Sequence, residues 1–165
     1  MSAASVATAV TAGVAGALAL DAVQREILLE ELATLVVQLR GPSAREPYEE
    51  LAAAVDEGAV GEDLLGRLEG FLEMLLQTGR VRKVHGAEAE QALLRLFYQT
   101  PRGSAARRST QSVNAALASL EGQAVESLLF TVQGPGVYRL GIATDHCRLT
   151  LEIDRHGVTV ESLEV

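Results

Sequence analysis

The sequence has little of what most binding sites are built from. It contains one cysteine, Cys147, no tryptophan, and only 4% aromatic residues among its 165 residues. A single cysteine excludes an intrachain disulfide framework, and the shortage of rings argues against a site that stacks sugars or bases. The net charge of −8 argues against general nucleic-acid binding, which depends on an excess of Lys and Arg.

What the sequence does have is enough apolar material to fold. Hydrophobic residues make up 48% of the chain and charged residues 22%, which excludes a disordered protein. A chain of this length buries roughly 68–70% of the surface that it exposes when unfolded, so it needs no metal or disulfide for stability. We expect one domain of ordinary size, or one domain with an appendage.

The first 20 residues carry no charged side chain. A signal peptide needs a basic segment before its apolar core, but the first basic residue is Arg25. A transmembrane helix is marginal, because Val and Leu supply few of the positions and Ala, Gly, Ser and Thr most of the others. A disordered, alanine-rich tail is a further alternative.

The spacing in this segment favours a helix that packs against other helices. Val and Leu recur every four residues, and small residues four apart would allow two helix backbones to approach closely. The candidate oligomer interface is Val6, Val10, Gly13, Val14, Gly16 and Leu18. An amphipathic stretch continues from Asp21 to a stop at Gly41-Pro42, which predicts one long helix of about 35 residues. Residues 1–41 would then form a segment for oligomerisation or for contact near a membrane.

Residues 42–165 are predicted to form an α+β domain. Apolar residues three and four apart predict helices over about residues 44–121. Ser43 and Glu46 match a capping box at the start of the first of them. The predicted helical spans are 43–58, 62–79, 86–99 and 104–121.

After Gly122 the apolar residues alternate with polar ones, which predicts a four-stranded antiparallel meander over about residues 123–164. Helices in the first two-thirds of the chain followed by strands indicate an α+β fold. One face of the meander is apolar and needs helices to cover it. The residues that we expect to be buried there are Leu128, Phe130, Leu140, Leu149, Leu151 and Ile153.

The residues that could carry chemistry do not form a recognisable site. His146 and Cys147 are neighbours, so a strand would point them to opposite faces, and their spacing to His156 matches no metal-ligand pattern. A Cys–His nucleophile is disfavoured because Cys147 falls on the predicted buried face. We therefore assign no catalytic, cofactor-binding or metal-binding residue, and we expect the protein not to be an enzyme.

One dense basic cluster stands out in this acidic chain. The candidate partner patch is Arg80, Arg82, Lys83, Arg107 and Arg108. It could bind an acidic protein or another anionic partner. Alternatively, the basic side chains offset the dipole of a helix C-terminus and pair with nearby acids.

An alanine-rich helical N-terminus followed by a body of short helices and strands resembles the small scaffold subunit of quinone-linked uptake nickel–iron hydrogenases. That resemblance implies several copies per complex, closeness to a membrane, and an apolar chamber able to hold a quinone. We expect a cytoplasmic, non-catalytic scaffold subunit that self-associates and docks on a larger protein complex at the membrane surface. The alternative is a small adaptor or regulatory module that binds an acidic protein or nucleic acid through Arg80–Arg108.

Overall fold

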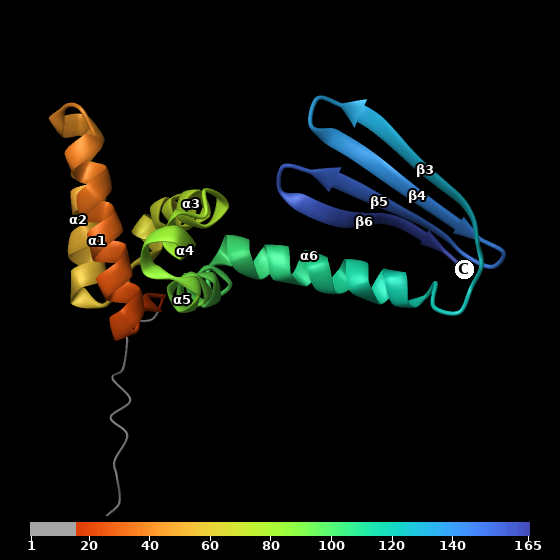
Figure 1. The fold of residues 1–165 in the computed structure, drawn as a ribbon, viewed down its shortest axis with the longest axis horizontal. Helices are drawn as coiled ribbons and strands as arrows, with labels where there is room; N and C mark the ends of the chain where they lie inside the picture. The colour runs from red at the N-terminus through yellow and green to blue at the C-terminus, as the bar shows by residue number, and fades with distance from the viewer. Residues whose placement is uncertain (1–15) are drawn as a thin grey trace, which may run out of the picture. The chain divides into compact units, whose positions relative to one another are not determined.

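The computed structural model describes residues 16–165 of the chain, which divides into two compact units between Phe97 and Tyr98 (Figure 1). The first unit is mostly helical, and the second is one helix with a four-stranded sheet. The α+β fold and the C-terminal antiparallel meander that the sequence predicts are both confirmed.

The first unit contains five helices and a two-stranded ribbon among its described residues. Leucines and valines on α1, α2, α3 and α5 form its hydrophobic core, and Leu28, Leu32, Leu51 and Leu68 are completely buried. The elements are β1 (Leu18–Ala19), α1 (Ala22–Gln38), α2 (Pro42–Glu57), β2 (Ala59–Val60), α3 (Glu62–Gln77), α4 (Arg80–His85) and α5 (Ala87–Phe97).

The predicted long N-terminal helix is wrong in the part that the structure describes. Residues 18 and 19 form strand β1, in which Leu18 pairs with Val60 and Ala19 with Ala59. Helix α1 begins only after Asp21. The Asp21 carboxylate accepts a hydrogen bond from the Gln24 backbone at 2.8 Å, and the Gln24 side chain accepts one from the Asp21 backbone at 3.0 Å. This capping box fixes the start of α1 directly after Asp21, so the helix cannot extend back into the residues before Asp21.

The predicted oligomer interface is changed accordingly. Gly16 has a φ of +106° and Leu18 packs half-buried against the core of the first unit, so neither belongs to a helix. Val6, Val10, Gly13 and Val14 lie outside the described residues.

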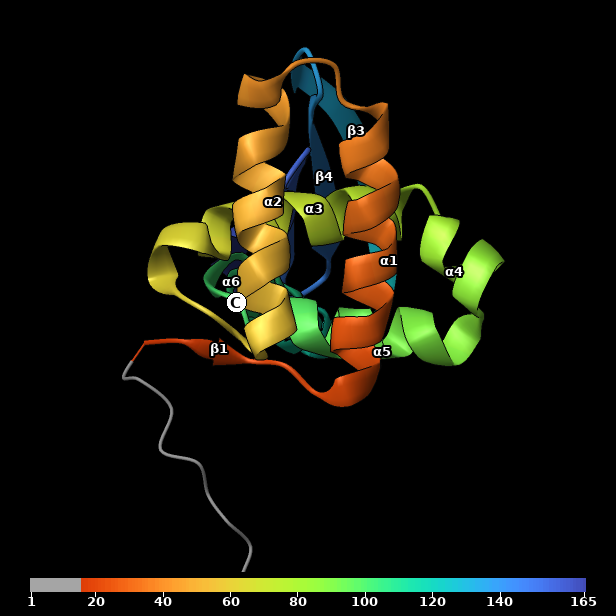
Figure 2. The same cartoon turned by 90° about the vertical axis from the view of Figure 1, so that its left-hand side faces the viewer.

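The predicted domain boundary at residues 41 and 42 is also wrong. Helices α1 and α2 run side by side and share one hydrophobic core, in which Leu28 and Leu32 meet Leu51 and Val55 (Figure 2). The predicted cap at Ser43 is wrong as well, because α2 begins at Pro42 after Gly41 and no side chain caps it. Gly41-Pro42 therefore ends one helix and starts the next within a single unit.

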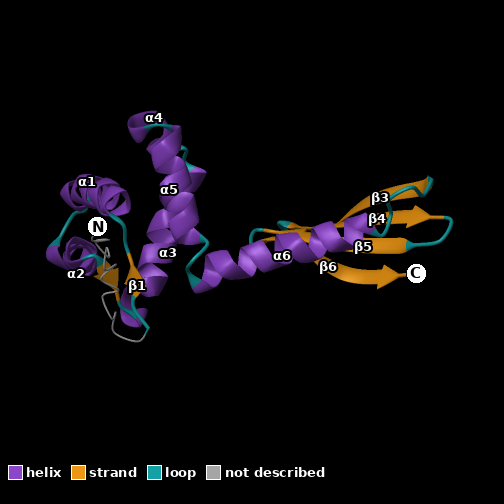
Figure 3. Cartoon of the chain, turned by 90° about the horizontal axis from the view of Figure 1, so that it is seen from below, coloured by secondary structure: helices purple, strands orange, loops and turns teal. Residues whose placement is uncertain are grey.

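The second unit consists of α6 (Pro101–Ala118), β3 (Val125–Gly134), β4 (Val137–Thr144), β5 (Arg148–Asp154) and β6 (Gly157–Glu164). The strands pair in sequence order, β3-β4-β5-β6. Helix α6 packs mainly on β6 and less on β5 (Figure 3). Val113 and Ala116 of α6 form a small core there with Leu149 and Leu151 of β5.

Four of the six residues predicted to be buried on the meander are not fully buried, and two of these, Leu140 and Ile153, are half-buried. Leu149 and Leu151 are buried as predicted, but Leu128 and Phe130 of β3 are 66% and 59% exposed. The predicted register is not at fault, because Phe130 pairs with Leu140 and Leu140 with Leu151, so all three point to one face. The error arises because the single helix covers β5 and β6 and leaves β3 open.

This difference in burial predicts two different costs of truncation. Leu151→Ala should destabilise the second unit by about 2–5 kcal/mol, since it removes a fully packed side chain. In the monomer, Leu128→Ala should cost less than about 0.5 kcal/mol, because water reaches that side chain in the single chain. Hydrogen exchange of the β4 and β5 amides reports the opening free energy of this unit. Equal losses in the two variants would contradict the burial described here.

Candidate functional site

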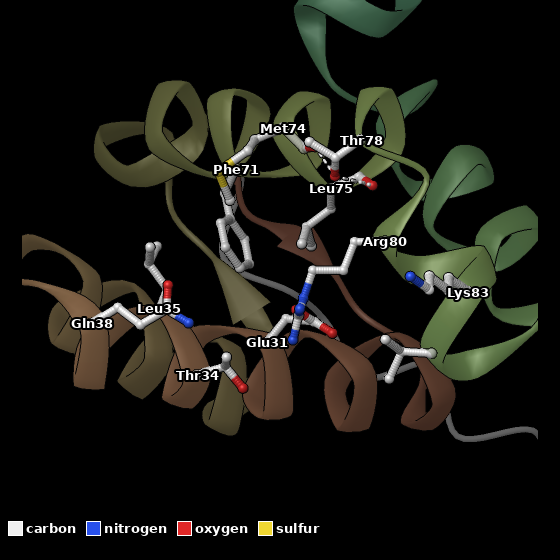
Figure 4. Close-up of a pocket in the computed structure, with 11 residues that line it drawn as sticks. Glu31, Thr34, Leu35, Gln38, Phe71, Met74, Leu75, Thr78, Arg80 and Lys83 are labelled. Atoms are coloured by element: carbon white, nitrogen blue, oxygen red, sulfur yellow. Dashed lines mark hydrogen bonds and ion pairs between the residues drawn. The ribbon is translucent and has the colours of Figure 1, made fainter.

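A cavity of about 470 Å³ opens in the first unit between α1, α3 and α4 (Figure 4). Its lining residues come from these three helices and from the turn between α3 and α4. They are Glu31, Thr34, Leu35, Gln38, Phe71, Met74, Leu75, Thr78, Arg80, Lys83 and Val84.

One side of the cavity is apolar. Phe71 and Leu75 lie four residues apart on α3, so one face of that helix carries both, and they point into the cavity opposite Leu35 of α1 (Figure 4). Both side chains are nearly completely buried, at 3% and 2% exposure. Met74 extends the apolar wall toward the opening and is 41% exposed.

The other side contains a buried carboxylate with two basic partners, an arginine and a histidine. Glu31 is only 4% exposed. Its Oε2 atom accepts a hydrogen bond from Arg80 Nε at 2.5 Å, and its Oε1 atom lies 2.9 Å from His85 Nε2. The Nδ1 atom of His85 lies 3.7 Å from a carboxylate oxygen of Glu30. A buried carboxylate needs such partners, because burial of an unpaired charge costs several kcal/mol.

The partners of Glu31 decide its protonation. Burial by itself would raise the pKa of the Glu31 carboxyl. The hydrogen bonds and charges of Arg80 and His85 together outweigh that effect and hold the pKa below its ordinary value of 4.5. Glu31 is therefore ionised at neutral pH and acts as a fixed acceptor for the two side chains of α4.

The short helix α4 explains how these side chains reach the cavity. It lies between Gly79 and Gly86, whose φ angles of +63° and +90° reverse the chain on either side. Arg80 and Lys83 are three residues apart, so they share one face of α4, and both line the cavity. Among the described residues, Lys83 has no hydrogen-bond or ion-pair partner.

The candidate partner patch is only partly assembled. Arg80 and Lys83 share the cavity, whereas the exposed Arg82 lies 3.6 Å from Glu90 of α5. Arg107 and Arg108 belong to the second unit, where Arg108 donates a hydrogen bond to Ser104 of the same helix. For Arg80 and Arg82, the pairing with acids matches the alternative interpretation of the basic cluster.

Glu31 is not among the residues predicted from the sequence, although its position in the sequence carries a signal. Glu31 lies four residues after Ile27 and four before Leu35, so it falls on the buried face of α1. An acid within an apolar stripe needs a buried cation. The unassigned basic segment around Arg80 was the place to look for it.

A second candidate surface lies on the sheet of the second unit. The apolar sheet surface comprises Leu128, Phe130 and Val132 of β3 and Tyr138 of β4, which are between 37% and 68% exposed. The rings of Phe130 and Tyr138 stack with their centroids 5.6 Å apart. β3 is also a terminal strand of the sheet, so one edge of its backbone has no strand partner among the described residues.

The remaining cysteine and histidine candidates stay separate. Cys147 is buried, and its backbone N–H donates to Thr144 Oγ1 at 2.9 Å. The neighbouring His146 is 76% exposed and lies 3.3 Å from Asp145. Within residues 16–165, no three His, Cys, Asp or Glu side chains are grouped so that they could hold a metal ion.

Comparison of the chain with protein-family models, with curated proteins and with solved structures finds no match. Across the described part of the chain, none of the helices is both long enough and apolar enough to cross a bilayer. The cavity and the apolar sheet surface are therefore interpreted from their own geometry.

The Glu31 cluster predicts a specific loss of stability in acid. Because the pKa of Glu31 is lowered in the folded state, its contribution is fully present above pH 4.5 and is lost as the pH falls through the lowered value. Glu31→Gln should lower the stability of the first unit by about 1–3 kcal/mol at neutral pH. It should also flatten the decline below pH 4.5.

Hydrogen exchange of the α1 amides at neutral and acidic pH measures both effects. Glu30→Gln is the matched control, because Glu30 is 63% exposed and lies at the edge of the cluster. An acid-dependent loss of the same size in wild type and Glu31→Gln would show that Glu31 is not the group responsible.

Proposed function

We propose that this protein is a non-catalytic assembly protein that associates with a second copy of itself and supports a larger protein complex. The observation that carries the proposal is the apolar sheet surface. Three of its side chains, Leu128, Phe130 and Val132, lie on one sheet face and are more than half exposed. Large apolar side chains gathered on one exposed face are typical of a surface that binds another protein.

The same face is covered elsewhere in the sheet. Leu149 and Leu151 of β5 lie under α6, whereas the matching positions on β3, two strands away, are not covered by it. Each square ångström of apolar surface left in water costs about 25 cal/mol relative to its burial. A second layer over β3 and β4 would recover that free energy, and no described element of the unit supplies it.

The chemistry of this surface supports a second copy as the occupant. None of its four residues is charged, so two copies related by a two-fold axis would place apolar groups against apolar groups without repulsion. The open backbone edge of β3 lies beside it and gives a further means of contact between chains. An acidic or basic partner would find no complementary charge there.

The N-terminal segment is a second candidate surface for the same function. Its uncharged residues 1–15 still supply the small-residue pattern that predicts self-association, although residues 18 and 19 belong to β1. The resemblance to a hydrogenase scaffold subunit supports a membrane-associated redox complex as the larger partner. We do not propose the adaptor function, because Arg82 pairs with Glu90 and Arg80 is held by Glu31 in the lining of the cavity, so these two side chains do not form one exposed basic surface.

Light scattering over about a hundredfold range of concentration tests self-association. The full chain should show a mass above that of the 17.5 kDa monomer. Leu128→Ser combined with Phe130→Ser should shift the chain toward the monomer, because it removes the apolar contact. Val37→Ser is the matched control, since Val37 is 79% exposed on α1, outside the apolar sheet surface.

A chain that lacks residues 1–15 separates the two candidate surfaces, because it leaves β1 intact. If only this deletion produces monomers, self-association depends on the N-terminal segment and the apolar sheet surface is not its interface. A monomeric full chain at every concentration would refute self-association altogether.

A further inference from the structure

We propose that the cavity of the first unit is a binding site for a small amphipathic anion, a molecule with an apolar chain or ring and one carboxylate. This proposal concerns a different surface from the proposed function and does not depend on it. Ligand cavities in proteins usually enclose about 300–1,000 Å³, with mostly apolar walls and a few fixed polar groups. The cavity of about 470 Å³ between α1, α3 and α4 has this size and this division.

The polar side is suited to an anion because Glu31 binds the guanidinium of Arg80 only at its Nε edge. The Nε–H of Arg80 donates to the Glu31 carboxylate, while its two Nη groups have no partner among the described residues. Figure 4 shows the guanidinium crossing the cavity from α4 toward α1. An arginine held at one edge keeps the N–H groups at its other edge available for a carboxylate.

Lys83 adds a second cation to the same side. It lies one turn after Arg80, and its amine points toward the same space (Figure 4). Arg80 already pairs with the charge of Glu31, so Lys83, which has no acidic partner among the described residues, adds a further cation at the opening. A cationic ligand would be repelled here, since the one buried carboxylate of the cavity is already occupied by its partners.

The apolar side determines the rest of the ligand. Phe71 and Leu75 of α3 and Leu35 of α1 supply the apolar part of the cavity lining. Met74 and Val84 also line it and are 41% and 56% exposed. An apolar chain that entered the cavity would cover these two side chains. Methionine adapts to ligands of different shape, because its side chain is unbranched and polarizable.

Titration of the full chain with decanoate and with decan-1-ol, followed by calorimetry and amide NMR shifts, tests the proposal. Decanoate should bind saturably and about fivefold to tenfold more tightly than the alcohol, which lacks the charge. Added salt should weaken decanoate binding and leave the alcohol unaffected. The largest amide shifts should fall on Thr78, Arg80 and Lys83.

Three variants identify the site. Lys83→Gln should reduce the preference for decanoate, with Arg80 supplying the remainder, and should not change the affinity for decan-1-ol. Thr34→Phe should weaken both, because it places a ring in the cavity. Arg107→Gln makes the same charge change on α6, outside the cavity, and should change neither.

Three results would overturn the proposal. The first is the absence of saturable binding of decanoate. The second is a loss of affinity in Arg107→Gln equal to that in Lys83→Gln. The third is a set of shifts confined to β3 and β4, which would place the decanoate on the apolar sheet surface instead.

Discussion

The arrangement of the first unit depends on the burial of one charge. Glu31 lies on the face of α1 that packs inward, between leucines that are completely buried, and a carboxylate in that position needs cationic partners. Arg80 and His85 meet that need from the two ends of the six-residue helix α4. The contacts of Arg80 and His85 with Glu31 hold α4 beside α1, and they hold the Arg80 side chain in the cavity. A buried apolar residue at position 31 would remove the contacts of Arg80 and His85 with that position and leave only the longer contact of His85 with Glu30 between α4 and α1. The polar side of the cavity would then lose the acceptor that orients Arg80.

In the second unit, a single helix is too small to cover the apolar face of the whole sheet. This sheet has four strands with one apolar face, but α6 packs mainly on β6 and less on β5. The result is a gradient of burial across one face, from the completely buried Leu149 to Leu128, which is 66% exposed. The half of the sheet under α6 supplies the core of the unit together with that helix. The other half stays in water until a second layer covers it, which is why we interpret that half as an interface and not as a defect of folding.

The sequence predicts the parts of this structure that depend on periodicity. The alternation after Gly122 gives the meander, its strand order and the common face of Phe130, Leu140 and Leu151. Periodicity does not say how far a helix covers that face, so the exposure of Leu128 and Phe130 could not be predicted. At the N-terminus, the local capping box of Asp21 and Gln24 overrides a longer-range pattern of apolar residues. Glu31 could have been found, because a charge within an apolar stripe requires a partner. Its cationic partner Arg80 could not be predicted, because the two residues lie 49 positions apart in the sequence.

The two candidate surfaces belong to separate hydrophobic cores, one in each unit. A substitution on the apolar sheet surface changes contacts of β3 and β4 and leaves the core of the first unit intact. A substitution at Lys83 changes an exposed charge on α4 and removes no contact of the sheet. Changes at sites that share no partner add their effects within a few tenths of a kcal/mol. Ligand binding and self-association can therefore be measured in the same full chain as independent properties. If a substitution on the apolar sheet surface changed the affinity for decanoate, or a substitution at Lys83 changed self-association, a coupling free energy would connect the two properties.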